Sequence, residues 1–260
     1  MVGDLIMEVE GESTVAMGFY PSVNKIAGKE NTVVNITVLR GGQLIPCDII
    51  REVVDIPSVE FRMIGEDIGY ISIAEFNSKT PDQLKEKMEK IIGISGVKGC
   101  IIDVRNNGGG DAGGVINSLD LFIDQGLIVS FVDKNGNKNE YPAHEGAYDI
   151  PVVILTNEST ASAAELFAEA IRESANARIV GTTTYGKGVS QSVINLRDGT
   201  ALVVTDTKYY TPNGQNYDGI GVVPDFEVIM PEEQLAHFYE LTDSEDNQLS
   251  YGINLLKGTG

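Results

Sequence analysis

Basic residues are scarce in this chain of 260 residues. Lysine and arginine together number 19 against 38 aspartates and glutamates, which gives a formal net charge of −19. A protein that binds nucleic acid needs a basic face to neutralise phosphates, so this composition argues against nucleic acid as a partner. The same charge favours solubility and repels acidic substrates at long range.

Cysteine and histidine are scarcer still, with two of each. Cys47 and Cys100 form no CxxC pair, so a metal site built on thiolates is not predicted. Cys100 stands in an apolar run and is expected to be a buried, unreactive thiol. His144 and His237 stand alone in polar segments, which disfavours a Ser-His-Asp triad.

Long apolar runs are absent as well. No run approaches the roughly 18 residues of a membrane-spanning helix, and no signal-peptide pattern opens the chain. Apolar residues make up 42% of the sequence and charged residues 22%, which is typical of a globular protein. This composition excludes the disordered and fibrous classes, and the length allows one large domain, or one domain plus a fragment, with a sizeable core.

The chain changes character at Pro57. Before it, the sequence predicts short strands and one short helix, with a β-branched strand over Thr32–Leu39 that stops at the turn signal Gly41-Gly42. After it, apolar strands alternate with helices, a pattern that predicts an α/β core. The core strands are expected at residues 68–74, 99–104, 151–155, 178–181, 190–196 and 201–207.

The first helix of this core has a well-marked start. Thr80 can cap it and Pro81 suits its first position. Gln83 completes a capping box, and Gly93 ends the helix. Further helices are expected from the loop at 106–110 through residue 123, over 161–173, and once more after residue 231, where a polar end follows.

The first candidate for chemistry is the junction Asn157–Glu165, between a predicted strand and a predicted helix. A serine at a helix N-terminus faces unpaired backbone N–H groups, and the helix dipole favours negative charge there. A nucleophile beside such donors is the arrangement that a tetrahedral intermediate needs. The segment by itself favours the alternative that Ser159, Thr160 and Ser162 only cap the helix.

The second candidate is the lysine of Gly181–Gly188. This segment nearly matches a phosphate loop, but Gly188 replaces the hydroxyl residue that holds magnesium, and strand signals follow instead of a helix. A lysine enclosed between Gly186 and Gly188 would be desolvated, and its neutral amine could take a proton from a serine. Taken alone, Lys187 would be assigned as a solvated loop residue.

The third candidate is the glycine-rich loop within Asp103–Gly113. Gly108–Gly113 satisfies GxGxxG, but Val104–Asn107 separates most of the strand from the first glycine, a longer connection than a dinucleotide turn needs. The match to a dinucleotide site is therefore weak. Exposed N–H groups along the three glycines could instead hold an oxyanion or bind a peptide backbone.

Together and in this order, the three segments resemble the C-terminal processing (tail-specific) peptidase family. The match runs from about Gly69 to Asp225. The resemblance implies a Ser-Lys serine protease with a mixed α/β core that is crotonase-like and Clp-protease-like. Ala164 stands where relatives often carry serine, and the glycine loop lacks a proline that many have. The matching motifs are Arg-Asn-Asn-Gly-Gly-Gly, Ser-Thr-Ala-Ser-Ala-Ala-Glu, Thr-Tyr-Gly-Lys-Gly-Val-Ser-Gln, Asp206–Gly214 and Gly219–Asp225.

Carried over residue by residue, the resemblance assigns roles to five positions. Ser162 matches the nucleophile, Lys187 matches its general base, and Gln191 matches the residue that positions the lysine. The backbone N–H groups of Ala163 and Gly110 would hold the oxyanion. The implied reaction proceeds through an acyl-enzyme and needs neither a metal nor a cofactor.

The resemblance also suggests an identity for the N-terminal region. Gly3–Gly11, the helix near Val23–Ala27 and Thr32–Arg40 look like the second half of a PDZ domain, which in the family binds substrate C-termini by strand addition. The half with the carboxylate-binding loop is missing, and a divergent small β domain is the alternative. The predicted domains are residues 1–57, the C-terminal half of a PDZ domain; 58–230, the protease core; and 231–260, a C-terminal helix and tail.

The implied function is a serine endopeptidase that cleaves protein substrates near their C-termini. Its expected partners are proteins or peptides, and neither nucleic acid nor a nucleotide is expected. The sequence does not decide whether the chain forms a homo-oligomer. The resemblance implies an extracytoplasmic location, with or without a membrane anchor. A catalytically silent peptide-binding homologue is one alternative, against which Ser162, Lys187 and Gln191 argue. A nucleotide- or cofactor-binding protein is the other, and Gly188 disfavours it.

Overall fold

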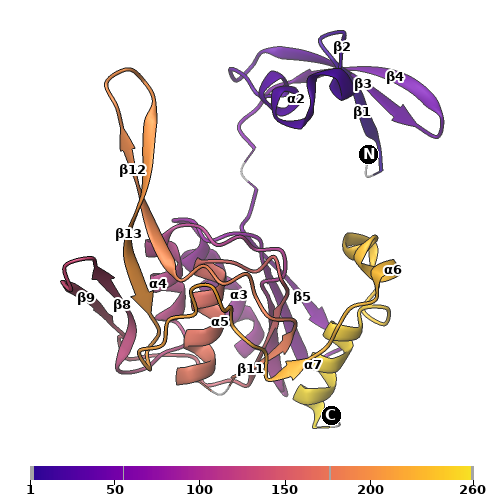
Figure 1. Cartoon of the computed structure of the whole chain (residues 1–260). Helices are drawn as coiled ribbons and strands as arrows, with labels where there is room; N and C mark the ends of the chain where they lie inside the picture. Colours follow the sequence, from indigo (N-terminus) through magenta and orange to yellow (C-terminus); the bar gives the residue numbers. More distant parts are fainter. Residues whose placement is uncertain (1–2, 55, 176, 259–260) are drawn as a thin grey trace. The chain divides into compact units, whose positions relative to one another are not determined.

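The computed structural model describes residues 3–54, 56–175 and 177–258 of the chain. These residues form two compact units, 1–56 and 57–260 (Figure 1). Among the described residues, the first unit contains one sheet and one hydrophobic core, and the second contains two sheets and two hydrophobic cores.

The first unit is a four-stranded antiparallel sheet with the strand order β2-β1-β3-β4. The predicted strand and turn are confirmed, because Gly41 and Gly42 join β3 to β4 with φ of 54° and 81°. Positive φ at both positions is what a two-residue hairpin turn of this hand requires. The elements are β1 (Leu5–Val9), β2 (Glu12–Ser13), α1 (Thr14–Met17), α2 (Phe19–Ile26), β3 (Val33–Arg40) and β4 (Gln43–Ile50).

The second unit is built on a six-stranded sheet with the order β14-β11-β10-β7-β6-β5, parallel except for the β5-β6 hairpin. Every residue of the central strands β7 and β10 is buried, as expected for strands covered on both faces. The expected mixed α/β core is confirmed. Its strands are β5 (Val59–Ile64), β6 (Ile68–Ile73), β7 (Gly99–Asp103), β10 (Val152–Thr156), β11 (Ala177–Gly181) and β14 (Phe226–Glu227).

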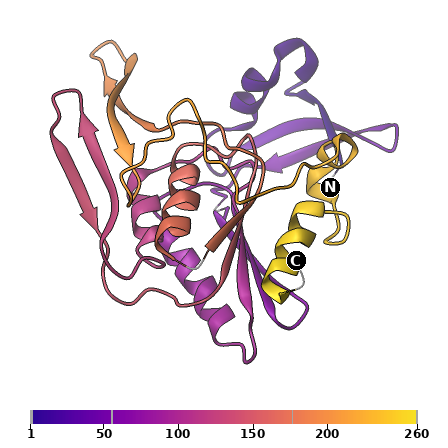
Figure 2. The same ribbon diagram turned by 60° about the horizontal axis from the view of Figure 1, so that its bottom comes forward.

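Helices cover both faces of this sheet, three on one face and one on the other (Figures 1 and 2). Leu84, Leu119 and Phe167 belong to the larger core on the first face, and Leu249 belongs to the core on the second. Cys100 lies fully buried in the larger core, and burial raises the pKa of its thiol, so the prediction of an unreactive thiol is supported. The helices are α3 (Thr80–Ile92), α4 (Ala112–Leu119) and α5 (Ala163–Ser174) on one face and α7 (Asn247–Lys257) on the other.

A second sheet of four antiparallel strands, in the order β12-β13-β8-β9, lies beside the helices of the larger core (Figure 1). Its β12-β13 hairpin projects away from the body of this unit. The sequence analysis predicted β12 and β13 but not β8 or β9. The strands are β8 (Leu127–Asp133), β9 (Lys138–Pro142), β12 (Val189–Asn195) and β13 (Ala201–Tyr210).

The start of α3 corrects the predicted capping box. The N-cap residue is Lys79, so Thr80 is already the first residue of the helix. The side-chain oxygen of Gln83 accepts hydrogen bonds from the backbone N–H groups of Ser58 and Val59, at 2.9 and 3.1 Å. These two donors at the start of β5 are buried, and a buried N–H group needs a partner. Gln83 therefore joins the helix to the sheet rather than capping it.

The ends of two other helices also differ from the predictions. Helix α4 ends at Leu119, although Phe122 and Ile123 remain buried in the turn that follows. The segment after Pro231 forms α6 (Glu232–Leu235), the short 3-10 helix η1 (Phe238–Glu240) and finally α7, rather than one helix and a polar end. Asp246 caps α7 by accepting a hydrogen bond from the backbone N–H of Leu249.

A buried arginine connects α7 to the central strand β7. Arg105 donates to both carboxylate oxygens of Asp103, at 2.6–3.1 Å, and to both of Asp246, at 2.7 and 3.1 Å. Gln248 accepts a further hydrogen bond at 2.9 Å, and the guanidinium lies 4.8 Å from the ring centre of Phe238. Burial by itself would lower the pKa of Arg105, but the two carboxylates raise it above its ordinary value. The guanidinium is thus a permanent cation between two acidic side chains.

Replacing Arg105 with methionine should lower the free energy of unfolding by about 3–5 kcal/mol, since removing one partner leaves buried, uncompensated carboxylates. Urea unfolding measures the change. The control is Lys90→Ala, which breaks the exposed pair with Glu86 and should leave the free energy of unfolding nearly unchanged, because water screens such a pair. Equal effects of the two substitutions would contradict this role for Arg105.

Candidate active site

One cavity of about 430 Å³ in the second unit brings the three candidate motifs together. All five residues singled out from the sequence line it: Ser162, Lys187, Gln191, Ala163 and Gly110. The other lining residues are mostly apolar and come from α4, α5 and the second sheet: Asp111, Ala112, Val115, Phe131, Leu166, Val189, Ser190, Val193, Val203 and Tyr209. Neither histidine is among these residues.

Ser162 has an unusual backbone conformation at the turn between β10 and α5. Its φ of 56° and ψ of −118° lie in a region that residues with a side chain rarely occupy. Such a conformation costs about 1–3 kcal/mol and persists only where the surroundings impose it. A sharp turn of this kind between a buried strand and a helix exposes the side chain at its tip, as in the nucleophile elbow of α/β-hydrolases.

The carboxylate of Glu165 holds this turn in place. It is fully buried and accepts hydrogen bonds from the backbone N–H groups of Ser162 (2.7 Å), Gly186 (2.7 Å) and Lys187 (2.8 Å). The hydroxyl of Thr184 donates a fourth. Burying a carboxylate is costly unless donors surround it, and here four donors do so. Glu165 thus connects the serine turn to the lysine loop.

The glycine loop approaches the serine turn too closely for any side chain. A Cβ atom on Gly109 would lie 2.9 Å from Ser162 Cβ, and one on Gly110 would lie 2.0 Å from the carbonyl oxygen of Phe76. The φ angles of Gly109 and Gly110, 100° and 140°, also favour glycine. Among the hydrogen bonds of the described residues, none is donated by the backbone N–H of Gly110 or of Ala163. Two N–H groups at the cavity are therefore available to a ligand.

Lys187 is half-buried and lines the same cavity. Its Nζ donates to the side-chain oxygen of Gln191 at 3.2 Å. Within the described part of the chain, this amine forms no ion pair and no hydrogen bond to Ser162. The glycines on either side let the loop pack closely, since a Cβ on Gly188 would lie 2.7 Å from the backbone nitrogen of Asp218.

Two buried tyrosines bind the main chain of both residues. The hydroxyl of Tyr209 donates to the carbonyl oxygen of Lys187, and that of Tyr217 donates to the carbonyl oxygen of Ser162 at 3.3 Å. Their rings meet edge to face with centroids 5.7 Å apart. Burial raises the pKa of Tyr209 to about 12 and that of Tyr217 well above its ordinary value, so both remain neutral donors.

The sequence analysis missed Glu165 and the two tyrosines as parts of this site. Glu165 stands three residues after Ser162, and the spacing Ser-x-x-Glu is a capping-box signal that could have identified it. Nothing in the local sequence of Tyr209 or Tyr217 indicates that they contact the main chain of Ser162 and Lys187. Those contacts join segments 22 and 55 residues apart.

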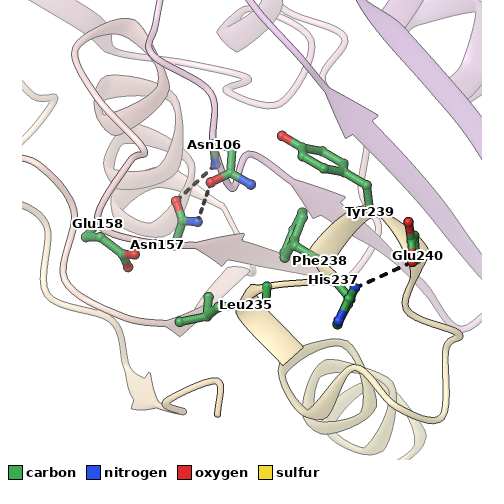
Figure 3. A pocket seen from close by; sticks show the side chains of 9 residues that line it. Asn106, Asn157, Glu158, Leu235, His237, Phe238, Tyr239 and Glu240 are labelled. Carbon is green, nitrogen blue, oxygen red and sulfur yellow. Dashed lines mark hydrogen bonds and ion pairs between the residues drawn. The ribbon is translucent and has the colours of Figure 1, made fainter. Parts of the chain in front are cut away.

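A second cavity, of about 360 Å³, is lined by Asn106, Asn157, Glu158 and the segment 235–240 (Figure 3). Asn106 and Asn157 form a reciprocal pair there, with 3.0 Å from the Asn106 backbone N–H to Asn157 Oδ1 and 2.8 Å from Asn157 Nδ2 to Asn106 Oδ1. This pair holds Asn106 at a φ of 59°, directly before the glycines. The exposed pair His237–Glu240 lies at its other side, at 3.6 Å. The cavity contains no serine or lysine side chain.

Across residues 3–54, 56–175 and 177–258, no group of three acidic, histidine or cysteine side chains is arranged to hold a metal ion. No helix in these ranges is both long enough and apolar enough to cross a lipid bilayer.

The fold and the cavity define a class of mixed α/β hydrolases, and comparison with known proteins identifies the family. The sequence pattern of Peptidase family S41 matches residues 67–228, and this chain belongs to that family. The resemblance inferred from the sequence motifs is thereby confirmed.

Curated relatives and solved structures agree with this assignment. The chain is 31% identical over 98% of its length to a carboxyl-terminal-processing protease of Synechocystis, and 34% identical over 89% to a probable CtpA-like serine protease of Staphylococcus haemolyticus. The solved structure of a photosystem II D1 C-terminal processing protease is 30% identical, with a TM-score of 0.62, over 88% of this chain and 64% of that one. This chain spans 60% of the Synechocystis relative and 47% of the staphylococcal one.

Replacing Glu165 with glutamine should loosen the connection between the serine turn and the lysine loop. An amide group would turn an NH₂ toward backbone donors, so we expect a loss of about 1–3 kcal/mol of stability. Hydrogen exchange at the amides of Ser162, Gly186 and Lys187 should also accelerate.

The matched control is Glu158→Gln, which changes an exposed carboxylate before the same helix. Exchange at the three amides should be unchanged in that variant. Unchanged exchange in both variants would show that Glu165 does not hold these segments.

Proposed function

We propose that this chain is the catalytic part of a serine endopeptidase that cleaves protein substrates near their C-termini. The observation that carries the proposal is that Ser162, in a strained turn, and Lys187 line one cavity and are joined through the same buried carboxylate. Membership of a peptidase family supports protein or peptide substrates. It gives no support to a catalytically silent homologue.

In the proposed mechanism, the neutral amine of Lys187 takes the hydroxyl proton of Ser162 as Oγ attacks the carbonyl carbon of a peptide bond. The oxyanion accepts hydrogen bonds from the N–H groups of Ala163 and Gly110. The C–N bond then breaks, and the leaving amine receives the proton from the Lys187 ammonium group. Water attacks the acyl carbonyl carbon and passes a proton to Lys187, and the Lys187 ammonium group returns this proton to Ser162 Oγ as the ester C–O bond breaks. The serine hydroxyl is thereby restored, and the acid product loses its proton to solvent and leaves as a carboxylate.

Gln191 holds Lys187 before the reaction starts. The Nζ–Oε1 hydrogen bond of 3.2 Å keeps the amine in the cavity but away from the serine hydroxyl. The proposal therefore requires Nζ to turn toward Ser162 when substrate binds. Catalytic hydrogen bonds are often long or absent without substrate and tighten in the complex.

The proposal extends to the organisation of the chain outside the active site. Residues 1–57 would be the C-terminal half of a PDZ domain, supported by a sheet with the short helix α2 packed against it. Residues 58–230 would form the protease core and residues 231–260 a C-terminal extension. An extracytoplasmic location rests on the family resemblance.

Replacing Ser162 or Lys187 with alanine should lower the rate of casein cleavage at least about 1000-fold, because each removes an essential member of the dyad. Gel electrophoresis and mass spectrometry of the fragments measure the rate. Lys187→Arg should be as inactive, since a guanidinium stays protonated.

The matched control is Ser159→Ala, which removes another hydroxyl from the same helix start and should leave the rate within about twofold. Normal activity of either dyad variant would refute the assignment. A parent chain that cleaves nothing would refute peptidase activity for this chain.

A further inference from the structure

The cavity that contains Ser162 has a charged side chain that the proposed mechanism leaves without a role. Of the residues that line this cavity, two carry a charge, Lys187 and Asp111. Lys187 is assigned as the general base, whereas the carboxylate of Asp111 takes no part in acyl transfer. A charge among apolar and uncharged polar side chains influences which ligands bind beside it.

Asp111 is held in place by its main chain and by one carboxylate oxygen. Its backbone N–H donates to the carbonyl oxygen of Phe76 at 2.7 Å. Its Oδ2 accepts a hydrogen bond from the backbone N–H of Gly114 at 2.7 Å and so caps α4. Among the described residues, Oδ1 accepts no hydrogen bond and Asp111 forms no ion pair. Asp111 therefore keeps one carboxylate oxygen available to a donor from a ligand.

The position of Asp111 in the chain places it near the reacting groups. A Cβ atom on Gly109 would lie 2.9 Å from Ser162 Cβ, and the backbone N–H of Gly110 is the proposed oxyanion donor. Asp111 directly follows Gly110, and consecutive Cα atoms are about 3.8 Å apart. A long side chain near the scissile bond of a substrate can therefore reach Asp111.

Lys187 does not neutralise this carboxylate. Its Nζ donates to Gln191 Oε1 at 3.2 Å, and no ion pair joins it to Asp111 within the part of the chain that the structure describes. The proposed mechanism also requires Lys187 to be a neutral amine when it accepts the serine proton. The negative charge of Asp111 therefore remains to attract a cation and to repel an anion.

The side chains beside Asp111 suit the stem of a long basic residue. Ala112 follows Asp111 directly, Val115 lies one turn further along α4, and both line the cavity together with Leu166. Lysine and arginine pack their apolar stems on such surfaces while the charged head stays at a polar group. A substrate lysine or arginine can thus place its stem on these apolar side chains and its head at Oδ1 of Asp111.

We propose that Asp111 is a specificity-determining residue that binds the ammonium or guanidinium group of a substrate lysine or arginine within two positions of the scissile bond. The preferred substrates are then unfolded segments in which a basic residue stands among apolar ones. The proposal rests on the peptidase function proposed above and adds the substrate class to it. The net charge of −19 also attracts basic segments, but at long range. Asp111 acts by contact, so its effect depends on the position of the basic residue.

The test compares peptides that differ only in charge. Each fluorescein-labelled peptide of valine, alanine and threonine contains one arginine, and its partner has citrulline, a neutral isostere, at the same position. This position is moved along the peptide one residue at a time. Fluorescence anisotropy measures each dissociation constant with the Ser162→Ala chain, which does not cleave the peptide. At one or two neighbouring positions, arginine should bind about three- to fivefold more tightly than citrulline, because it adds a partly screened charge contact.

A change at Asp111 tests the same contact from the protein side. Asp111→Asn, made in the Ser162→Ala chain, removes the charge and keeps a good N-cap, so α4 should keep its start. The preference for arginine should fall below about 1.5-fold, while the affinity for the citrulline peptide stays the same. The matched control is Asp82→Asn, which removes an exposed carboxylate from the first turn of α3, away from the lining of the cavity. It should leave the preference unchanged, because salt screens distant charges.

The outcomes separate this inference from the proposed function. Equal binding of arginine and citrulline peptides at every position, or no binding of any peptide, would overturn the role of Asp111. An equal loss of preference in Asp111→Asn and Asp82→Asn would assign it to the net charge, and this too would overturn it. So would a weakening of both peptides alike by Asp111→Asn, which would make Asp111 only structural. If the preference holds but the parent chain cleaves neither the arginine peptide nor casein, the peptidase function alone is refuted.

Discussion

The buried carboxylate of Glu165 is the interaction on which the rest of the site depends. A charge with no exposed surface is stable only if hydrogen-bond donors replace its water, and here the donors come from two segments more than twenty residues apart. Satisfying Glu165 therefore requires the turn at Ser162 and the loop at Lys187 to meet. The same contacts offset the strain of a serine held at positive φ. Electrostatic satisfaction of one side chain thus aligns the two residues proposed to react.

The glycine loop is supported in a complementary way from behind. Arg105 anchors the end of β7 to α7 through Asp103 and Asp246, and Asn157 holds the backbone of Asn106 (Figure 3). Only glycine fits at Gly109, which lies against the serine turn, and at Gly110, which lies against the backbone of Phe76. The free N–H groups at the cavity therefore belong to a rigid backbone, which is what preorganised stabilisation of an oxyanion requires. The C-terminal helix, although distant in sequence, takes part in this support.

The second sheet has a different role from the first. The central strands of the six-stranded sheet are buried on both faces, and their C-terminal ends lead into the turns that form the site. In the second sheet, β12 is an edge strand that borders the cavity.

The sequence by itself determined the α/β class, most core strands and helices, and the segments that carry Ser162 and Lys187, because periodicity and turn residues are local signals. Several elements required long-range information. Strands β8 and β9 form mainly by pairing with β13 and with each other, and Gln83 joins β5 because buried donors there lacked partners. The role of Glu165 was also decided only by the tertiary structure. Whether a side chain is a helix cap or a buried link between two loops depends on which distant donors surround it, and no local pattern encodes those contacts.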